Sequence, residues 1–509
     1  MNALAMPTKS DLSILSDPRL FREFAYVGGA WTDGSSRRSI DVTDPVDGSR
    51  VGSVPALTAG DAAQAVQAAH RAFATWSTEP PHRRARMLQR WHDLIVTARE
   101  DLARLMVQEQ GKPLSEARGE IDYAASFVAF YAEEAKRVSR EGITSHLPDA
   151  EMSVIRQPVG VAALVTPWNF PAAMLTRKAA AALAAGCTIV AHPSSETPFS
   201  ALALAELGER AGFPAGVFNV VTGDAPEIVA AFTGSPLVRA LSFTGSTAVG
   251  RLLYAQSAPT IKRLVLELGG HAPFIAFADC AFDRAVDRAI AAKFATSGQD
   301  CLAANRFYIE RPIYERFVRA FAAKVRKMRI GPGMSDPDIG PLMNERAIAK
   351  QKEHVADALA RGARLITGGS VHLAGPLFFE PTVLADVPED AAIFREETFG
   401  PVAAFAAFDE EADVIETANR TETGLVAYLY TGDDSRIARI VSQLEFGMVA
   451  VNRTKITGAP VPFGGVKQAG IGREGSRHGM DAYTDLIYVC RDTSRSNNTS
   501  DKELDHADK

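Results

Sequence analysis

Cys301 has the surroundings expected of a reactive thiol. It lies in SGQDCLAANR, residues 297–306, among small and polar residues at a predicted junction between a helix and a loop. A substrate and backbone N–H groups can approach a sulfur there, and both favour attack by a thiolate. A cysteine taken alone is more often structural than nucleophilic, so its neighbours must decide.

The other three cysteines, Cys187, Cys280 and Cys490, lie in or beside apolar runs, where packing is the expected role. Four cysteines in 509 residues, without a CxxC pair or a Cys/His ligand spacing, argue against a disulfide framework and against a metal site. We therefore expect reduced thiols and no bound metal.

Two further residues have chemistry to offer. Glu267 is a carboxylate inside the apolar segment LVLELGG, where it either bonds a structural partner or is kept as a base by desolvation. Asn169, in TPWNFP, either stabilises a developing oxyanion or forms an Asx turn. The residues alone leave both pairs of alternatives open.

The segment FTGSTAVG, residues 243–250, places Gly245, Ser246 and Gly250 between a predicted strand and a predicted helix. Free backbone N–H groups at such a turn suit a pyrophosphate, but the same residues also make an ordinary helix cap. The turn follows the fourth strand candidate instead of the first, so any dinucleotide would bind in an atypical way.

Charge and composition exclude several classes of partner. The formal charge is −6 and both signs are interspersed, so we expect no nucleic-acid face and no polybasic membrane anchor. Apolar stretches are too short to span a bilayer, and the N-terminus does not resemble a secretory signal. The predicted setting is small-molecule chemistry in the cytoplasm.

The elements that must position these residues follow an α/β rhythm. Residues 61–137 show helical spacing, and five apolar strand candidates then alternate with helices at 161–165, 188–192, 217–221, 238–243 and 262–268. The alternation resumes after Gly270 and includes Cys301. This pattern predicts an α/β fold with two doubly wound parallel-sheet domains, whose ligands bind beyond the carboxyl ends of the strands.

Six motifs occur together in one order: TPWNFP, FTGSTAVG, LELGG, SGQDC, EETFGP and PFGGVKQAGIGREG. Over residues 20–490 the chain thereby resembles the NAD(P)-dependent aldehyde dehydrogenase superfamily. Within it, MLTRKAAAALAAGC and PLVRALSFTGST are most similar to the bacterial succinate-semialdehyde dehydrogenases.

The resemblance implies that Cys301 attacks an aldehyde, that Asn169 and the Cys301 N–H hold the oxyanion, and that Glu267 activates water for thioester hydrolysis. It implies the catalytic or supporting residue Lys178, the cofactor residues Thr166, Pro167, Trp168, His192, Ser195, Gly223, Gly245, Ser246, Glu397 and Phe399, and the substrate residues Arg177, Thr457, Arg453 and Phe463.

Two positions concern the choice of cofactor. Relatives mostly have Lys where His192 stands, and strict NAD users have Glu where Ser195 stands. Neutral imidazole gives a 2′-phosphate little charge to bind, whereas loss of the Glu removes a group that repels it. We predict that NAD is used and that NADP is tolerated.

The substrate end departs from the resemblance. Succinate-semialdehyde dehydrogenases clamp the far carboxylate with two arginines, of which Arg177 is present and the other is replaced by Ala295. Loss of such a contact is worth about 1.5–3 kcal/mol. Arg453 and Lys455 of the loop NRTKITGA either compensate for this loss or belong to a solvated basic loop.

The main hypothesis is oxidation of a small, anionic aldehyde such as succinate semialdehyde. The alternatives are a neutral aliphatic or aromatic aldehyde, because Ala295 enlarges the pocket, and a non-catalytic protein that retains the fold. Relatives that transfer the acyl group to coenzyme A lack the Glu present at 267.

The expected organisation includes a small β element for assembly into a homodimer or homotetramer. Its bounds are 139–157 and 480–493. The other expected parts are an N-terminal arm at 1–20, a cofactor-binding domain at 21–138 and 158–266, a catalytic domain at 267–479 and a disordered tail at 494–509.

Overall fold

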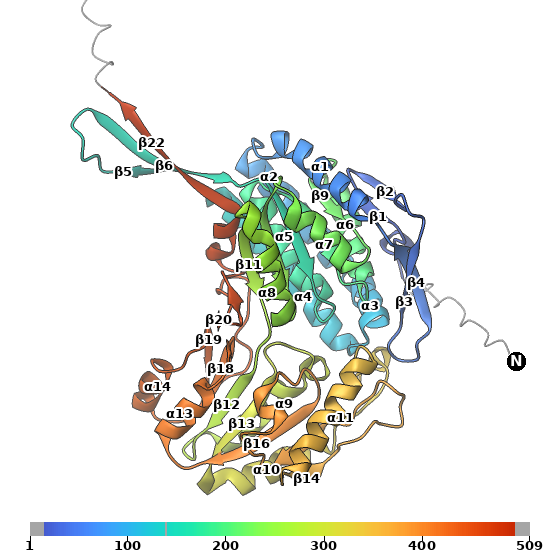
Figure 1. Cartoon of the computed structure of the whole chain (residues 1–509), viewed down its shortest axis with the longest axis vertical. Helices are drawn as coiled ribbons and strands as arrows, with labels where there is room; N and C mark the ends of the chain where they lie inside the picture. The colour runs from blue at the N-terminus through green and yellow to red at the C-terminus, as the bar shows by residue number, and fades with distance from the viewer. Residues whose placement is uncertain (1–14, 138–139, 494–509) are drawn as a thin grey trace, which may run out of the picture.

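The computed structural model describes residues 15–137 and 140–493, which form two α/β parts and a projecting arm (Figure 1). Most of the predicted N-terminal arm and the whole C-terminal tail lie outside the described residues. Residues 15–20 of this arm are packed against the first part, because Leu15 and Leu20 are buried. The backbone N–H groups of Ser16 and Asp17 also donate to the Asp101 carboxylate, both at 2.9 Å.

Four helices form the predicted helical opening. Thr58 caps the first, since its hydroxyl accepts from the Asp61 N–H while the Asp61 carboxylate accepts from the Thr58 N–H. Gly111, at φ 87°, ends the third in a left-handed conformation that favours glycine. Their bounds are α1 (Ala59–Trp76), α2 (Pro81–Thr97), α3 (Arg99–Gln110) and α4 (Leu114–Glu134).

The first sheet has eight strands in the order β2-β1-β9-β8-β7-β10-β11-β21. Its five central strands are parallel and match the five predicted apolar runs, while short antiparallel strands flank them on both sides. The bounds are β1 (Ala25–Val27), β2 (Ala30–Thr32), β7 (Val161–Thr166), β8 (Thr188–Pro193), β9 (Phe218–Val220), β10 (Val238–Thr244), β11 (Arg263–Glu267) and β21 (Gly470–Ile471).

Alternate side chains of β7 enter two separate cores, which explains why the strand is apolar throughout. Ala162 and Leu164 pack with α2 to α6, whereas Val161, Ala163 and Val165 pack with α1, α7 and α8. The helices not yet given are α5 (Pro171–Ala185), α6 (Pro198–Ala211), α7 (Ala225–Gly234) and α8 (Thr247–Ser257).

The second sheet has seven strands in the order β14-β15-β16-β13-β12-β18-β19 and is parallel except at β14. Helices cover both of its faces. The strands are β12 (Ala272–Ala276), β13 (Ala304–Glu310), β14 (Arg364–Thr367), β15 (Thr382–Ala385), β16 (Val402–Phe408), β18 (Val426–Tyr430) and β19 (Met448–Val451). The helices are α9 (Phe282–Phe294), α10 (Arg311–Val325), α11 (Glu345–Ala360), α12 (Ala392–Arg395), α13 (Glu411–Asn419) and α14 (Asp434–Val441).

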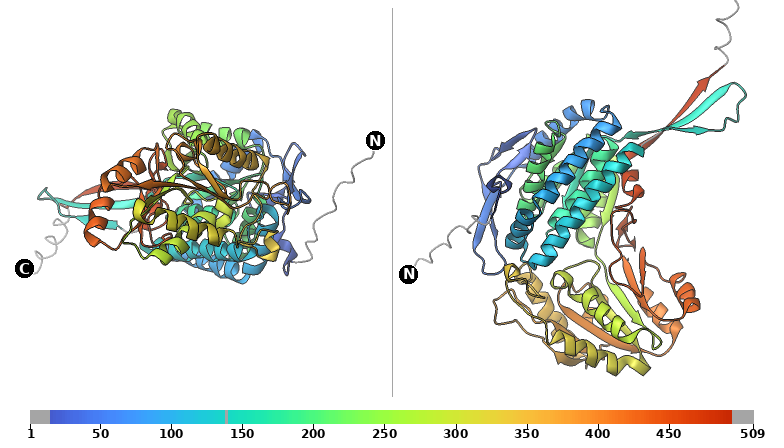
Figure 2. Two further views of the ribbon diagram at one scale, coloured as in Figure 1. Left: turned by 90° about the horizontal axis from the view of Figure 1, so that it is seen from below. Right: turned by 180° about the vertical axis from the view of Figure 1, so that it is seen from behind.

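The projecting arm is a three-stranded antiparallel sheet of β5 (Arg140–Ile143), β6 (Ala150–Pro158) and β22 (Thr484–Asp492), seen from two further sides in Figure 2. Cys490 is exposed on β22, so the prediction that it packs in a core is wrong. The remaining strands pair as β3 (Ser39–Thr43) with β4 (Arg50–Pro55) and β17 (Thr423–Gly424) with β20 (Val466–Lys467). Among the described residues, no helix is both long and apolar enough to cross a membrane.

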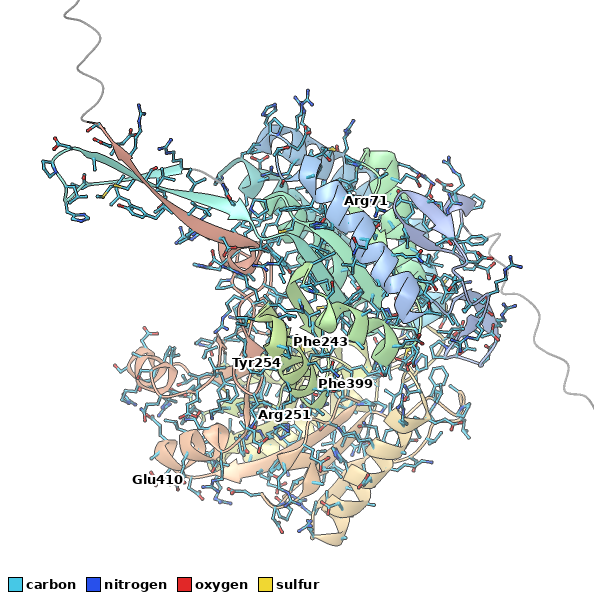
Figure 3. The ribbon with its side chains drawn as sticks, turned by 45° about the horizontal axis from the view of Figure 1, so that its top comes forward. Arg71, Phe243, Arg251, Tyr254, Phe399 and Glu410 are labelled. Atoms are coloured by element: carbon cyan, nitrogen blue, oxygen red, sulfur yellow. The ribbon has the colours of Figure 1, made fainter. Side chains whose placement is uncertain are left out.

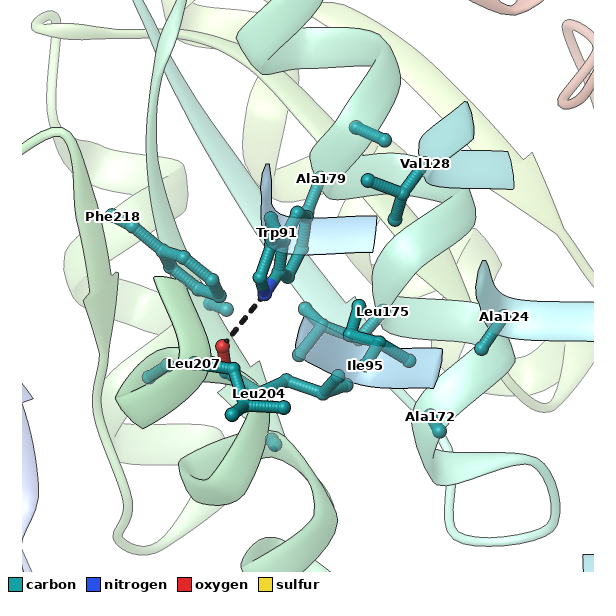
Figure 4. Close-up of a cluster of buried hydrophobic side chains, with 14 of the residues drawn as sticks. Trp91, Ile95, Ala124, Val128, Ala172, Leu175, Ala179, Leu204, Leu207 and Phe218 are labelled. Atoms are coloured by element: carbon teal, nitrogen blue, oxygen red, sulfur yellow. Dashed lines mark hydrogen bonds between the residues drawn. The ribbon is translucent and has the colours of Figure 1, made fainter. Parts of the chain in front are cut away.

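Trp91 of α2 lies at the centre of the core between α2, α4, α5 and α6 (Figure 4). Its indole N–H donates to the carbonyl of Leu204 at 3.0 Å, and its ring meets Phe213 and Phe218 edge to face. The buried polar atom is therefore satisfied while the ring fills the space between the helices.

We predict that Trp91→Ala lowers the free energy of unfolding by about 3–5 kcal/mol, because the change leaves a cavity. Val96→Ala, on the same helix but 49% exposed, is the matched control and should change it by less than about 0.5 kcal/mol. Urea unfolding followed by circular dichroism measures both variants. Equal midpoints would contradict the central role of Trp91.

Candidate active site

The carboxyl ends of the central strands lie level with one another. Thr166 of β7 is paired with Pro193 of β8, and Thr244 of β10 with Glu267 of β11. Parallel strands thus bring the predicted residues Thr166, His192, Gly245 and Glu267 to one edge of the first sheet. In Figure 3, Phe243 of β10 and Phe399 of the second part both appear where the two parts meet.

Cys301 follows the short 3-10 helix η5 (Ala295–Gly298) and precedes β13. Two residues of η5, Thr296 and Ser297, adopt left-handed φ values of 49° and 56°. The Cys301 carbonyl is packed against Gly270, where an added Cβ would lie 2.3 Å from its oxygen. The thiol is partly exposed, as a nucleophile requires, while its backbone is held tightly.

Electrostatics around Cys301 oppose ionisation of the thiol. Desolvation raises the pKa of Cys301 well above its usual value, and the carboxyls of Asp300 and Glu397 raise it further, whereas Arg177 lowers it. The expectation that the surroundings of Cys301 favour the thiolate is therefore wrong for the protein without ligands. The thiol needs a proton acceptor in order to react.

Asn169 is tied to the Cys301 loop. Its side-chain amide nitrogen donates to the backbone carbonyl of Gln299, two residues before the thiol, at 3.0 Å. The backbone carbonyl of Asn169 accepts from the Lys112 ammonium at 2.7 Å. Lys112 is buried and forms an ion pair with Glu120 at 2.5 Å. An Asx-turn role is thus not needed to explain Asn169, since its side chain bridges two loops of the site.

Glu267 is 2% exposed, and neither carboxyl oxygen has a hydrogen-bond partner among the described residues. Desolvation raises the pKa of Glu267 well above its usual value, followed by repulsion from Glu474, while Arg177 and Lys178 oppose the rise. Glu267 was expected either to bond a structural partner or to be kept as a base by desolvation, and no such bond is found among the described residues. A desolvated carboxyl of this kind is a strong base.

Glu474 is a central residue that the sequence interpretation missed. Its carboxylate accepts from Arg177 Nε at 2.5 Å, from Ser242 Oγ at 3.0 Å and from the Lys178 ammonium. Lys178 also donates to Thr244 Oγ1 at 2.7 Å, and among the described residues it forms no hydrogen bond with Asn169. Glu474 lies in the motif GIGREG, and the sequence interpretation assigned no role to this carboxylate.

Predicted cofactor residues from both α/β parts meet across the site. Trp168 and Phe399 pack edge to face with ring centroids 5.6 Å apart. Glu397 Oε1 accepts from the Gly270 N–H at 3.0 Å, and burial raises the pKa of Glu397 to about 7. These contacts align the segment EETFGP with the turn that follows β11.

The remaining predicted cofactor residues surround the same edge. The hydroxyl of Thr166 is buried and has no hydrogen-bond partner among the described residues, so it is free for a ligand. Ser246 caps α8 by accepting from the Val249 N–H, which confirms the helix-cap interpretation without testing the phosphate one. Pro167 follows β7, while an added Cβ at Gly223, which has a φ of 153°, would lie 2.7 Å from the Leu57 carbonyl oxygen.

His192 is buried and its Nδ1 lies 3.0 Å from the Val221 carbonyl oxygen, so Nδ1 carries the proton. Desolvation lowers the pKa of His192, which keeps the imidazole neutral. Ser195 is exposed. Thr166 Oγ1 and Nε2 of the neutral His192 would suit the hydroxyls of a dinucleotide, and His192 would offer a 2′-phosphate little positive charge.

A cavity of about 270 Å³ opens at Cys301. Three predicted substrate residues, Arg177, Thr457 and Phe463, line it, but Arg453 does not. The guanidinium of Arg453 turns back onto its own loop and donates to the Lys455 carbonyl at 2.9 Å. The wall also includes Ala295, Glu116, Asp300 and Lys455.

Comparison with known proteins agrees with this geometry. The model of the aldehyde dehydrogenase family matches residues 31–489. A succinate-semialdehyde dehydrogenase [NADP(+)] of Escherichia coli is 51% identical over 94% of this chain and 99% of its own length. A glutarate-semialdehyde dehydrogenase of Pseudomonas aeruginosa is 50% identical over the same shares.

A solved structure of succinate-semialdehyde dehydrogenase from Burkholderia pseudomallei is 50% identical and superposes with a TM-score of 0.93, over 94% of this chain and 100% of that one. The chain belongs to the aldehyde dehydrogenase family. It is an NAD(P)-dependent aldehyde dehydrogenase.

We predict that Asp300→Asn speeds alkylation of Cys301 by iodoacetamide at pH 7.5 without cofactor. Removing the negative charge lowers the pKa of the thiol, and each unit gives about tenfold more thiolate, so we expect a three- to tenfold increase. Mass spectrometry of the Cys301 peptide measures the rate. Asp283→Asn, at an exposed carboxyl of α9, is the control. An unchanged or slower rate would contradict the electrostatic account.

Cofactor choice gives a second prediction. Wild type should use NAD and tolerate NADP, and a preference for NADP above about a hundredfold in kcat/KM, near 3 kcal/mol, would contradict this. His192→Lys should raise kcat/KM for NADP about tenfold by adding a charge for the 2′-phosphate, whereas Ser195→Glu should lower it. Steady-state kinetics with each dinucleotide measures these changes, and a His192→Lys variant with unaltered NADP kinetics would exclude His192 from the ribose site.

Proposed function

We propose that this enzyme oxidises a small aldehyde with an anionic far end, a semialdehyde such as succinate semialdehyde, to its carboxylic acid with NAD(P)⁺. The observation that supports this most is that one cavity joins the Cys301 thiol to the predicted substrate residues Arg177, Thr457 and Phe463. The names of the similar proteins agree with this substrate class.

In the proposed reaction Cys301 gives its proton to solvent water and its sulfur bonds the aldehyde carbon, giving the oxyanion of a thiohemiacetal. Asn169 lies on the loop beside the thiol, so its amide can share the oxyanion with the Cys301 N–H. NAD(P)⁺ bound beside the sulfur would supply the acceptor for the hydride that the thiohemiacetal carbon loses as the Cys301 thioester forms. Glu267 then takes a proton from water, whose oxygen attacks the thioester carbon and releases the acid and the thiol.

The cluster around Glu474 supports the role of Glu267. Arg177 and Lys178 favour the ionised form of Glu267, while desolvation and Glu474 favour the protonated form. A carboxyl under these opposing influences can both hold and release a proton. Lys178 is thereby proposed to support catalysis through charge, without touching the reacting carbon.

A second candidate is a neutral aliphatic or aromatic aldehyde, favoured by the exposed Ala295 and by the rings of Tyr123, Phe170 and Phe463 in the cavity wall. Comparing kcat/KM for succinate semialdehyde, glutarate semialdehyde and benzaldehyde separates the two. The proposal requires the two semialdehydes to be the better substrates. A non-catalytic protein would show no nucleotide reduction, and Cys301→Ala would then have no effect.

We further propose the division into parts expected from the sequence, with 21–138 and 158–266 around the first sheet and 267–479 around the second. Assembly into a homodimer or homotetramer through the arm is supported by Leu486 and Tyr488, which are exposed on β22. Four free cysteines support action in the reducing cytoplasm.

We predict that Glu267→Gln uncouples the two halves of the reaction. One equivalent of reduced nucleotide should still form in a burst, whereas kcat should fall at least about a hundredfold because water is no longer activated. Stopped-flow absorbance measures both, with Glu410→Gln at a surface carboxyl labelled in Figure 3 as control. Loss of the burst together with a fall in kcat would show that Glu267 acts in a step before hydride transfer.

A further inference from the structure

Lys455 places an ammonium group at the same cavity as Cys301. It belongs to the loop that follows β19, and its side chain is exposed and lines the cavity. Among the described residues its ammonium forms no ion pair and donates no hydrogen bond, since only its backbone carbonyl is engaged, by Arg453. Its charge is therefore available to a ligand.

The other cation of the cavity wall, Arg177, is already paired with a carboxylate, which Lys178 shares. Arg177 Nε donates to Glu474 at 2.5 Å, its Nη2 faces the sulfur of Met174 at 3.0 Å, and its guanidinium lies 4.1 Å from the centre of the Phe463 ring. A buried guanidinium compensated by a carboxylate attracts a second anion less than a free cation does.

The rest of the wall is acidic or uncharged. Ala295 offers no charge, and Asp300 and Glu116 are carboxyls. Both Glu116 oxygens are engaged by the Thr296 N–H, at 2.9 and 3.1 Å, so this acid is fixed in place beside Ala295. An anionic substrate group near this part of the wall would be repelled whenever the acids are ionised.

We propose that Lys455 is the specificity-determining contact for the anionic end of the substrate, which it binds as a carboxylate or sulfonate at the rim of the cavity. This inference rests on the proposed function. It goes beyond that function by placing the anion site at a solvent-exposed lysine and not at the buried Arg177. An ammonium is a hydrated point charge without the planar fork of a guanidinium. It therefore accepts anions of different shape, and salt screens it.

The test compares Lys455→Met with Lys327→Met, the same change at an exposed lysine just after α10 that does not line the cavity. Each variant and wild type are assayed with succinate semialdehyde and with butanal, which has the same number of carbons but no carboxylate. Lys455→Met should lower kcat/KM for succinate semialdehyde about tenfold, mainly through KM, and leave butanal within about twofold. Lys327→Met should leave both within about twofold.

Two further measurements test the role of charge. Lys455→Arg should restore most of the lost efficiency, and raising KCl from about 20 to 500 mM should weaken succinate semialdehyde oxidation by wild type but not by Lys455→Met. Retained butanal turnover shows that each variant is folded.

Each outcome decides a separate point. If wild type prefers succinate semialdehyde over butanal and Lys455→Met keeps that preference, the inference fails and the proposed function stands. If wild type treats the two aldehydes alike, both fail. Equal losses for both aldehydes in Lys455→Met would show that Lys455 shapes the loop and does not bind the anion.

Discussion

Burial of one carboxylate between two cations is the interaction on which the candidate site depends. Glu474 joins Arg177 and Lys178 of α5 to the glycine-rich segment after β21, and all three side chains are at most 4% exposed. Uncompensated charges in such a place would be costly, so the three groups must stay together. β21, which directly precedes this segment, pairs with β11 at Glu267 through Gly470, and the base is thereby held beside the cluster.

The proton balance of the site follows from this burial. The pKa values of Cys301 and Glu267 are both raised, chiefly by desolvation, and Glu397 is raised to about 7. A thiol that resists ionisation therefore lies in a site with carboxyls that bind protons well. Protonation here is a property of the group as a whole, and a change at Asp300 or Glu474 should be felt at the sulfur and at the base together.

Much of the fold could be predicted because buried parallel strands are apolar along their whole length, as β7 and β8 are. The edge strands β1, β2 and β21 were missed, since two or three residues give no periodicity. Asn169 and Cys301 were predicted together from a family pattern. Glu474 was missed because an acid among glycines and charged residues looks exposed in sequence. Arg453 was chosen over Lys455 because sequence does not show which way a loop side chain turns.

The loop after β19 lies outside both hydrophobic cores of the second part, apart from Ile456, which packs against one of them. Exchanges at its exposed positions should leave the scaffold intact while altering which aldehydes are accepted. Natural or laboratory evolution could therefore retune the enzyme there by single steps that need no compensating stabilisation. The nucleophile loop, with its left-handed residues and glycine contacts, has no comparable freedom to vary.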